Sequence, residues 1–191
     1  GALADIGSHA LATAEFLCGP ITRVMGDCIT MITDRPDGRG GRKAVTVDDV
    51  GRAFVRFENG ATGSIEGNWI ATGRKMQHDF EVYGTKGSGS FDSMSSGEFH
   101  IFEVGAGDPR FNGAKRVITG PAHPYFSDVA AMPGAGVGTG YAEAFIAEIQ
   151  EFLVAVNGGK PMETDFAVAH QMMKVVDAAV ASDASKAPVS L

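Results

Sequence analysis

Apolar residues recur at helical spacing in three parts of the chain. The spacing predicts a first helix from about Ile6 to Leu17, ended by Gly19-Pro20. It predicts a second over residues 142–156, ended by Gly158-Gly159, and a third that Asp165 caps at its N-terminus. The apolar stripe of the first helix is Ala10, Leu11, Ala14, Leu17 and Cys18, and that of the second is Ala142, Phe145, Ile149, Phe152, Leu153 and Val156. The predicted buried face of the third is Ala169, Met172, Met173, Val176 and Val180.

Between the first two helices the pattern changes to alternation. Residues 21–32 predict a strand, a polar loop follows through Arg42, and residues 47–120 predict strand after strand, separated by turns at residues 58–60, 84–87 and 95–97. Residues 121–140 predict a loop, and residues 187–191 a short edge strand. We therefore expect an α+β fold, with an open, mainly antiparallel sheet and helices packed on one face. There are no internal repeats, and the pattern places no domain boundary within residues 1–191.

The turn Glu58-Asn59-Gly60 offers two strand registers. A two-residue loop would put Val55 and Phe57 on the same face as polar residues of the next strand. A type I turn with Gly60 in a left-handed bulge instead gathers the apolar residues on one face. In that register the apolar face is Ala53, Val55, Phe57, Ala61, Ile65 and Trp69, and the other face is Arg52, Phe54, Arg56, Thr62, Ser64, Glu66 and Asn68, with Arg52 opposite Glu66. We expect the bulged register, with Trp69 in the core.

Composition narrows the possible functions. The chain has 191 residues, of which 44% are hydrophobic and 20% charged, with a net charge of -7. This charge, without a local basic cluster, argues against nucleic-acid binding. No apolar run is long enough to span a bilayer and no signal peptide is recognisable, so we expect no membrane contact and a cytoplasmic location. The two cysteines, Cys18 and Cys28, are expected to be reduced thiols that behave as small core residues.

Asp5 and His9 are the leading candidates for chemistry. Four residues apart on a helix, their Cβ atoms would lie about 6 Å from each other, on the side opposite the apolar stripe together with Phe16, which makes a fully hydrated face unexpected. An imidazole titrates near neutrality and a carboxylate can orient it or hold a substrate hydroxyl, so the pair suits proton transfer. A local ion pair near a helix N-terminus is the alternative explanation.

Other candidates carry weaker signals. His78, His100 and His123 have no metal-ligand spacing, so no metal is expected. His123 lies in the predicted 121–140 loop and could contact a substrate. Residues 134–140 are glycine-rich, but their spacing differs from G-x-G-x-x-G and no strand leads into them, so no cofactor-binding residue is expected in this chain. His170, off the buried face of its helix, should face solvent.

The segment Gly1-Ala2-Leu3-Ala4-Asp5-Ile6-Gly7-Ser8-His9 resembles the active-site helix of the glucose–fructose oxidoreductase, inositol dehydrogenase and MocA (Gfo/Idh/MocA) family. The resemblance continues in family order over nearly the whole chain. It includes residues 57–61, 84–88 and 141–145, then Phe152, residues 158–161 and residues 164–166. The order of these segments makes the DIGSH motif a strong sign of the family.

The resemblance implies a substrate-binding and oligomerisation domain spanning residues 1–191, separated from an N-terminal Rossmann domain that lies outside this chain. It implies NAD- or NADP-dependent oxidation or reduction of a sugar, polyol or related hydroxyl compound. Asp5 would contact the substrate, His9 would be the acid/base, and a Lys of a Glu-Lys-Pro motif in the Rossmann half would complete the site. Ile6 and Ala12 are apolar where some polyol-binding relatives are polar, which argues against inositol itself.

Two further hypotheses compete with the dehydrogenase. The first is a non-catalytic family domain that serves self-association or ligand binding, and the second is a metal hydrolase built on Asp5, His9 and a distant histidine. The Asp5–His9 pair favours the enzyme, and the absence of further ligand spacing disfavours the hydrolase. We also expect a homo-oligomer through the open sheet face that carries Arg52, Phe54, Arg56, Ser64 and Glu66.

Overall fold

The computed structural model describes residues 1–137 and 140–191, and its contacts divide the chain into two compact units. The first unit comprises residues 1–73 and 163–191, and the second comprises residues 74–162. The chain passes into the second unit after residue 73 and returns to the first after residue 162. The sequence pattern predicts neither boundary.

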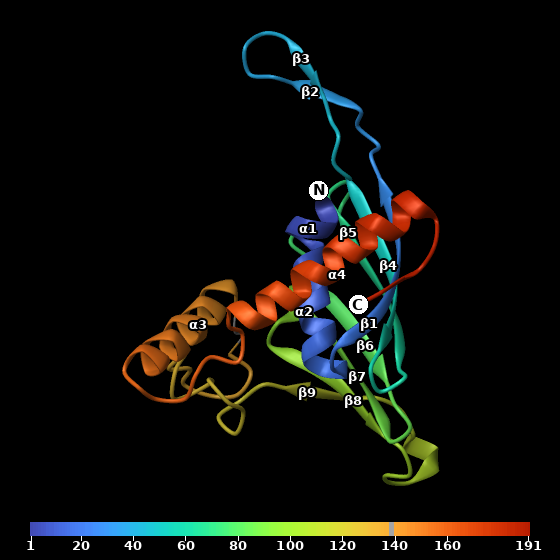
Figure 1. The fold of residues 1–191 in the computed structure, drawn as a ribbon. Helices are drawn as coiled ribbons and strands as arrows, with labels where there is room; N and C mark the ends of the chain where they lie inside the picture. Colours follow the sequence, from blue (N-terminus) through green and yellow to red (C-terminus); the bar gives the residue numbers. More distant parts are fainter. Residues whose placement is uncertain (138–139) are drawn as a thin grey trace. The chain divides into compact units, whose positions relative to one another are not determined.

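The first unit is one antiparallel sheet with helices on one of its faces (Figure 1). The strand order is β10-β1-β4-β5, and the predicted edge strand near the C-terminus is confirmed as β10. The strands are β1 (Ile21–Ile29), β4 (Val50–Phe57), β5 (Thr62–Asn68) and β10 (Val189–Ser190). The helices are α1 (Ala2–Asp5), α2 (Gly7–Cys18) and α4 (Phe166–Ser185).

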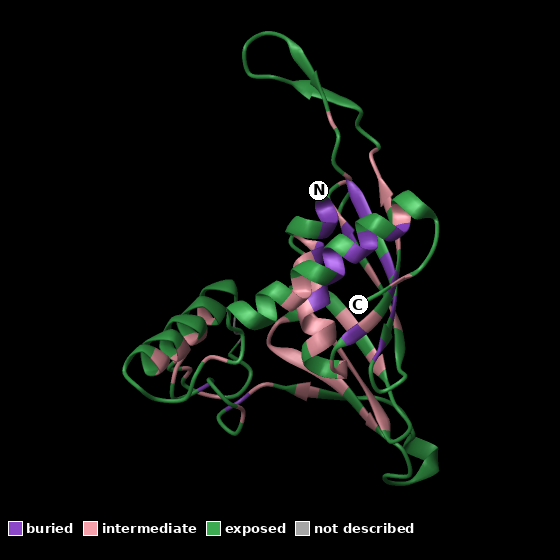
Figure 2. Cartoon of the chain, viewed as in Figure 1, coloured by how far each residue is buried: buried purple, intermediate pink, exposed green. Residues whose placement is uncertain are grey.

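The core lies between this sheet and its helices, where the buried residues of Figure 2 are concentrated. At Gly26 of β1 the backbone of α4 comes so close that a Cβ would lie 2.1 Å from the carbonyl oxygen of Ala179. The predicted buried face of α4 is partly wrong, because Ala169, Met173 and Val180 are exposed while Ala179 and Ser182 are buried. The core comprises Leu3, Leu11, Ile21, Val24, Ala53, Val55, Phe57, Val175, Val176, Ala178 and Ala179.

The bulged register of the β4–β5 hairpin is confirmed. Gly60 has φ +87°, the left-handed conformation that glycine tolerates best, and the amide of Phe57 donates to the carbonyl of Ala61. Arg52 is the Cα partner of Glu66, and its Nε lies 2.6 Å from Glu66 Oε2. Burial alternates along β4, so the two faces of the sheet differ as the register requires.

A short hairpin projects from the same unit where a polar loop was predicted (Figure 1). It consists of β2 (Asp34–Pro36) and β3 (Arg42–Ala44), and every residue of both strands is exposed. The prediction of an irregular loop is therefore wrong in part, because six residues without an apolar pattern pair as strands.

The second unit is a four-stranded antiparallel meander in the order β6-β7-β8-β9, followed by a helix. The turns predicted at residues 84–87 and 95–97 are confirmed between its strands, and residues 121–137 contain no helix or strand. Part of the glycine-rich 134–140 segment lies outside the described residues. The elements are β6 (Asp79–Tyr83), β7 (Gly87–Asp92), the 3₁₀ turns η1 (Ser93–Ser95) and η2 (Pro109–Phe111), β8 (Glu98–Glu103), β9 (Lys115–Ile118) and α3 (Tyr141–Val156).

These elements confirm the α+β class with open antiparallel sheets, although the strands form separate sheets rather than one. The helix predicted after Asp165 is also confirmed, since the Asp165 carboxylate accepts hydrogen bonds from the amides of Ala167 and Val168. Among the described residues, no helix has the length and apolar character needed to cross a bilayer.

Candidate active site

Asp5 and His9 lie in the helical segment that opens the chain. The segment is two helices rather than the single one predicted from Ile6, because α1 precedes α2 and the two meet at Ile6. Ile6 has φ -90° and ψ -30°, which are right-handed helical angles, so the chain advances almost as one helix. Asp5 therefore ends α1, and His9 lies in the first turn of α2.

The first helical turn is fixed by Asp48, which precedes β4. Its carboxylate accepts a hydrogen bond of 2.8 Å from the amide of Leu3, and its carbonyl accepts one of 2.9 Å from the amide of Ala2. A carboxylate at this position satisfies amides that have no partner within the helix and interacts favourably with the helix dipole. This anchor explains why the helix starts earlier than the apolar stripe predicts.

The junction of α1 and α2 touches the sheet at backbone level. A Cβ on Gly67 of β5 would lie 2.8 Å from the nitrogen of Gly7 and 2.9 Å from the carbonyl oxygen of Ala2. Only glycine permits this approach, and it sets the height of the helix above the sheet. Side chains on the outer side of the junction therefore have a fixed backbone beneath them.

The other end of α2 is tied down as well. The side-chain nitrogen of Asn59, in the β4–β5 turn, donates to the carbonyl of Cys18 at 2.9 Å, and Glu15 Oε1 accepts from the amide of Ile21 at 2.9 Å. Gly19, with φ +87°, ends the helix as predicted. Since Asn59 meets Cys18 and Gly67 meets Gly7, α2 and β5 run in opposite directions.

The outer side of this anchored helix presents Asp5 and His9 to solvent. Neither side chain forms a hydrogen bond or ion pair with another residue in the described part of the chain, so the local ion pair is not formed. Phe16, on the same side, is 75% exposed, which corrects the expectation that this face is partly covered. A carboxylate and an imidazole are thus free to engage a ligand from one rigid element.

Comparison with known proteins fits this arrangement. Residues 1–90 match the family model described as the GFO/IDH/MocA C-terminal domain. The chain is also 34% identical, over 205 aligned positions, to levoglucosan dehydrogenase from Pseudarthrobacter phenanthrenivorans. The alignment covers all of this chain and 52% of that enzyme. Residues 1–90, just under half of the chain, thus resemble a C-terminal domain of the Gfo/Idh/MocA family.

Solved structures resemble the whole chain as well. One is a levoglucosan dehydrogenase in complex with NADH and L-sorbose, with 35% sequence identity and a TM-score of 0.93. The match covers 100% of this chain and 50% of the levoglucosan dehydrogenase chain. An oxidoreductase domain protein from Kribbella flavida matches over the same shares at 34% identity and a TM-score of 0.91. The chain therefore spans about half the length of these relatives.

His123 lies in the second unit. Its Nδ1 accepts a hydrogen bond of 3.1 Å from the amide of Gly120, and its ring stands edge-on to Phe99, with 5.9 Å between the ring centroids. These contacts give the half-buried ring a packing role at the start of the 121–137 loop. Substrate contact by His123 stays a prediction.

Sequence reasoning missed or misplaced several residues around the helix. Trp69, expected in the core, is 56% exposed just beyond the end of β5. The sequence did not predict the role of Asp48, because this residue caps a helix that lies 45 residues away in the chain. His170 is exposed, as predicted.

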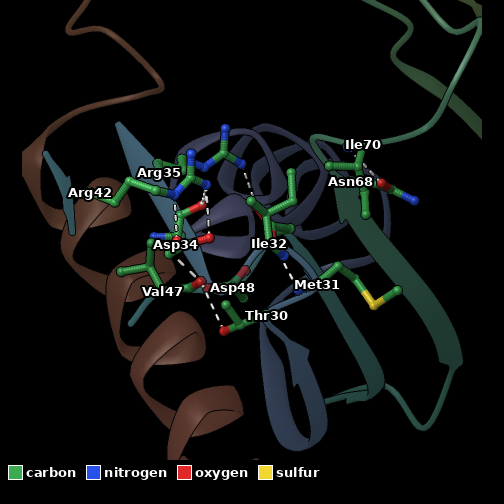
Figure 3. Close-up of polar contacts among 12 residues, drawn as sticks. Thr30, Met31, Ile32, Asp34, Arg35, Arg42, Val47, Asp48, Asn68 and Ile70 are labelled. Carbon is green, nitrogen blue, oxygen red and sulfur yellow. Dashed lines mark hydrogen bonds and ion pairs between the residues drawn. The ribbon is translucent and has the colours of Figure 1, made fainter. Parts of the chain in front are cut away.

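Asp49, also overlooked, is a buried anchor for the base of the β2–β3 hairpin. It accepts hydrogen bonds from the amides of Met31 and Ile32 and from Arg35 Nη2, at 2.7–2.8 Å. These bonds, above all the one from Ile32, hold the pKa of the Asp49 carboxyl below its usual value. Figure 3 shows neighbouring contacts at this base, including Thr30 with Val47 and Asp34 with Arg42.

The two cysteines and the possible metal ligands are the remaining candidates for chemistry. Cys18 and Cys28 are free and pack against the core, as expected. Burial, together with the nearby carboxylate of Asp48, raises the pKa of the Cys28 thiol to about 11, which keeps it protonated and unreactive at neutral pH. Within residues 1–137 and 140–191, no three His, Cys, Asp or Glu side chains are placed to hold a metal ion.

Proposed function

We propose that this chain is the substrate-binding half of an NAD(P)-dependent dehydrogenase acting on a hydroxyl group of a sugar, polyol or related compound. The observation that carries the proposal is the likeness of the entire chain to levoglucosan dehydrogenase. Solved relatives hold NADH with levoglucosan or L-sorbose, so we favour sugars over inositol as the substrate class.

The order of elements among the described residues differs from that of a Rossmann-type dinucleotide site. A pyrophosphate site of the Rossmann type needs a strand, a glycine-rich turn and a helix N-terminus in direct succession. Before α3, the last strand among the described residues ends at Ile118, more than twenty residues upstream. We therefore propose that an N-terminal Rossmann domain holds the NAD or NADP. The isolated 191-residue chain should show no heat of binding when titrated with either nucleotide.

His9 is proposed as the acid/base of the reaction. During oxidation its neutral imidazole takes the proton of the substrate hydroxyl, and during reduction the imidazolium returns it. The nicotinamide supplies the hydride acceptor or donor. Asp5, one helical turn away, accepts a hydrogen bond from a substrate hydroxyl or from His9, and a lysine of the Rossmann half is the third polar group that the family resemblance implies.

His9→Asn in the protein that joins both halves tests this role. Loss of a positioned proton acceptor lowers rates by roughly 10²–10⁴-fold, so kcat with levoglucosan should fall by that order. Because a histidine acts as a base only when neutral, the wild-type oxidation rate should decline toward acid pH, and the variant should lack this decline. His170→Asn, at an exposed histidine on α4, is the matched control and should leave both the rate and the pH profile unchanged.

Asp5→Asn separates positioning from proton transfer. If Asp5 mainly holds the substrate, KM should rise while kcat falls less than in His9→Asn. A pH profile unaltered by His9→Asn would remove His9 from the mechanism. Wild-type protein with bound nucleotide but no turnover of any sugar or polyol would instead favour the non-catalytic family domain.

We also propose a homo-oligomer built on the open face of the first unit's sheet. Three cross-strand rows lie there, set by the strand register. The central row holds Phe54, which is 69% exposed, and Met25. The rows are Arg23–Arg56–Thr62, Met25–Phe54–Ser64 and Asp27–Arg52–Glu66.

The charges of the outer rows complement each other. Arg23 and Arg56 form no ion pair with a carboxylate in the described part of the chain, whereas Arg52 is paired with both Glu66 and Asp27. One row therefore carries two unneutralised positive charges and the other a net negative charge. Two copies could face each other through these sheets, related by a two-fold axis parallel to the central row. In that arrangement the positive row of one copy lies opposite the negative row of the other. This complementarity supports a second copy as the partner of this face.

A cytoplasmic location is proposed with the same function, supported by the two free thiols.

A further inference from the structure

A bulge in β1 brings two arginines together on the open face of the first unit's sheet. Ile21 pairs with Phe57 and Arg23 pairs with Arg56, so Thr22 is the extra residue of β1 at this point. The hydroxyl of Thr22 donates to the carbonyl of Arg56 at 3.2 Å, which holds the bulge in place. In an unbroken ladder Thr22 would lie opposite Arg56. The bulge therefore makes the two arginines direct neighbours.

This pair of arginines is left without a counter-charge. Like charges that lie directly opposite each other on neighbouring strands repel and destabilise the pairing. Within the part of the chain that the structure describes, no carboxylate forms an ion pair with Arg23 or Arg56, whereas Arg52 on the same face lies 2.6 Å from Glu66 and 3.8 Å from Asp27. An anion bound between Arg23 and Arg56 would relieve the repulsion that the fold leaves in place.

The arginine pair lines a depression of about 500 Å³ on the open face. Thr62 and Ser64 of β5 line it too, and the strand register places Thr62 beside Arg56 on the same face. Both residues are exposed and carry hydroxyl groups that can donate to an anion. Because one depression is lined by all four residues, a single ligand can contact the guanidinium and hydroxyl groups together.

We propose that this depression binds a phosphate group, either free phosphate or a phosphomonoester, between Arg23 and Arg56. The planar guanidinium group donates two parallel hydrogen bonds that match the spacing of phosphate oxygens. Two arginines on a chain with a net charge of -7 suit one phosphate group rather than a nucleic acid or an anionic membrane surface. The site lies on the face opposite α1 and α2, which carry Asp5 and His9, and it does not rest on the proposed dehydrogenase function.

Occupancy of this site should oppose the proposed homo-oligomer. Arg23 and Arg56 belong to the row that we place opposite the negative row of a second copy. A phosphate bound between them neutralises that row, so the two copies lose the attraction between their charges. Phosphate and a second copy are therefore competitors for the same two arginines.

A nuclear magnetic resonance titration of the 191-residue chain tests the site directly. Free phosphate is added at constant ionic strength, at the lowest protein concentration that gives a spectrum, so that self-association competes least. The side-chain Nε–H signals of the arginines are followed in wild type and in Arg56→Gln and Arg23→Gln. Arg39→Gln is the matched control, because it removes the same charge from an exposed position on the β2–β3 hairpin, outside the depression.

The Nε–H signals of Arg23 and Arg56 should shift saturably in wild type. Arg56→Gln and Arg23→Gln should each weaken phosphate binding at least about tenfold, read from the arginine that remains, and Arg39→Gln should leave it unchanged. Shifts that do not saturate, or that are as large at Arg39, would mean general attraction of anions to basic residues and overturn the site. Phosphate binding that survives both substitutions overturns it as well.

Thermal unfolding separates loss of the site from loss of the fold. Because Arg56→Gln and Arg23→Gln each remove a repulsion, neither should lower the midpoint of unfolding in the absence of phosphate. Phosphate should raise the midpoint of wild type more than that of either variant, since a ligand stabilises only the form that binds it. An equal rise in all three proteins would contradict the site.

Two probes distinguish the sources of the phosphate group. Glycerol 3-phosphate is compared with free phosphate, and glycerol controls for the polyol part. Tighter binding of glycerol 3-phosphate than of phosphate assigns the site to a phosphorylated metabolite, and equal binding assigns it to free phosphate. If neither shifts the signals of Arg23 and Arg56 saturably, the proposal is wrong.

Sedimentation with and without phosphate, again at constant ionic strength, tests the competition. Self-association of wild type should weaken several-fold in phosphate, and that of Arg39→Gln should respond in the same way. Saturable phosphate binding with unaltered self-association would support the anion site and exclude the proposed pairing of charged rows. Self-association that weakens in phosphate without any shift at Arg23 or Arg56 would overturn the anion site, because phosphate would then act elsewhere.

Discussion

The two faces of the first unit's sheet share the same strands and differ in almost everything else. Along β4, Ala53, Val55 and Phe57 are buried under the helices, while Arg52, Phe54 and Arg56 alternate with them on the open face. The helix-covered face contributes to the core and holds the helices α1 and α2, which carry Asp5 and His9. The open face is exposed and carries the cross-strand rows of charged residues. β4 thus contributes its odd-numbered residues to the core and its even-numbered residues to the open face, where we propose that a second copy binds.

This division explains how the helical segment that carries Asp5 and His9 can be exposed on one side and anchored on the other. The contacts that fix α1 and α2 lie beneath them, at Asp48, Gly67 and Asn59, so the outer surface of the helices is left free. Substitutions on the three surfaces should therefore affect different properties: stability on the helix-covered face, turnover on the outer side of the helices, and association on the open face.

The largest stability effect is expected from Leu11→Ala. Leu11, on the buried side of α2, is fully buried, and loss of such a side chain costs about 2–5 kcal/mol. Phe54→Ala, which removes a larger side chain from the open face, should change the free energy of unfolding by less than about 0.5 kcal/mol. Urea denaturation at low protein concentration measures both, and comparable losses in the two variants would contradict the comparison.

The next effect concerns association through the open face. Arg23→Glu or Asp27→Arg should each weaken self-association at least about tenfold, because each brings like charges together in the proposed two-fold arrangement. The double variant carries the exchanged pair and should recover most of the association. Sedimentation over a range of concentrations compares the three. Wild-type protein that stays monomeric at high concentration would contradict the oligomer, and a double variant as weak as the single ones would exclude this pairing of rows.

A smaller effect on stability is expected from a substitution in the β4–β5 turn, which determines the strand register. Gly60 has φ +87°, so Gly60→Ala should cost about 1 kcal/mol of stability through backbone strain. Gly63→Ala is the control, because its added methyl group would meet Phe57 and Val55 only at ordinary contact distances of 3.5–3.6 Å. Thermal unfolding of both variants checks this, and equal shifts would mean that the bulge does not determine the register.

Structural features that depend on neighbouring residues in the sequence were predicted correctly. The Gly60 bulge followed from requiring one apolar face, and the Arg52–Glu66 pair followed from the bulge. The cap at Asp165 and the end of α2 at Gly19 are likewise local chemistry. Asp5 and His9 were placed on the outer side of a helix by spacing alone.

The features that escaped prediction depend on contacts between distant segments. Asp48 reaches back to Leu3 across 45 residues, and no local pattern marks such a cap. Trp69 followed the alternation of β5 onto the correct side of the sheet but lies beyond the point where helices cover it, and the sequence does not show where that cover stops. The face of α4 was misjudged at Met173 and Val180 because the close contact of Ala179 with Gly26 turns the helix toward β1.

The smallest effect is expected at Asp49, which belongs to neither face and anchors the β2–β3 hairpin at the start of β4. Its pKa is lowered in the folded state, chiefly by the hydrogen bond from the Ile32 amide, so its ionised form stabilises the fold at pH values above the unfolded pKa of about 4. That contribution is lost as the pH falls through the lower, folded-state value. The stability difference between wild type and Asp49→Asn should therefore be present at pH 7 and shrink steadily below about pH 4. Asp177→Asn, at an exposed position on α4, should differ little from wild type at either pH. Urea denaturation from pH 7 to pH 2.5 measures the differences, and amide exchange at Met31 and Ile32 reports the local anchor. A difference that stays constant with pH would show that Asp49 acts through its shape and neutral hydrogen bonds rather than through its charge.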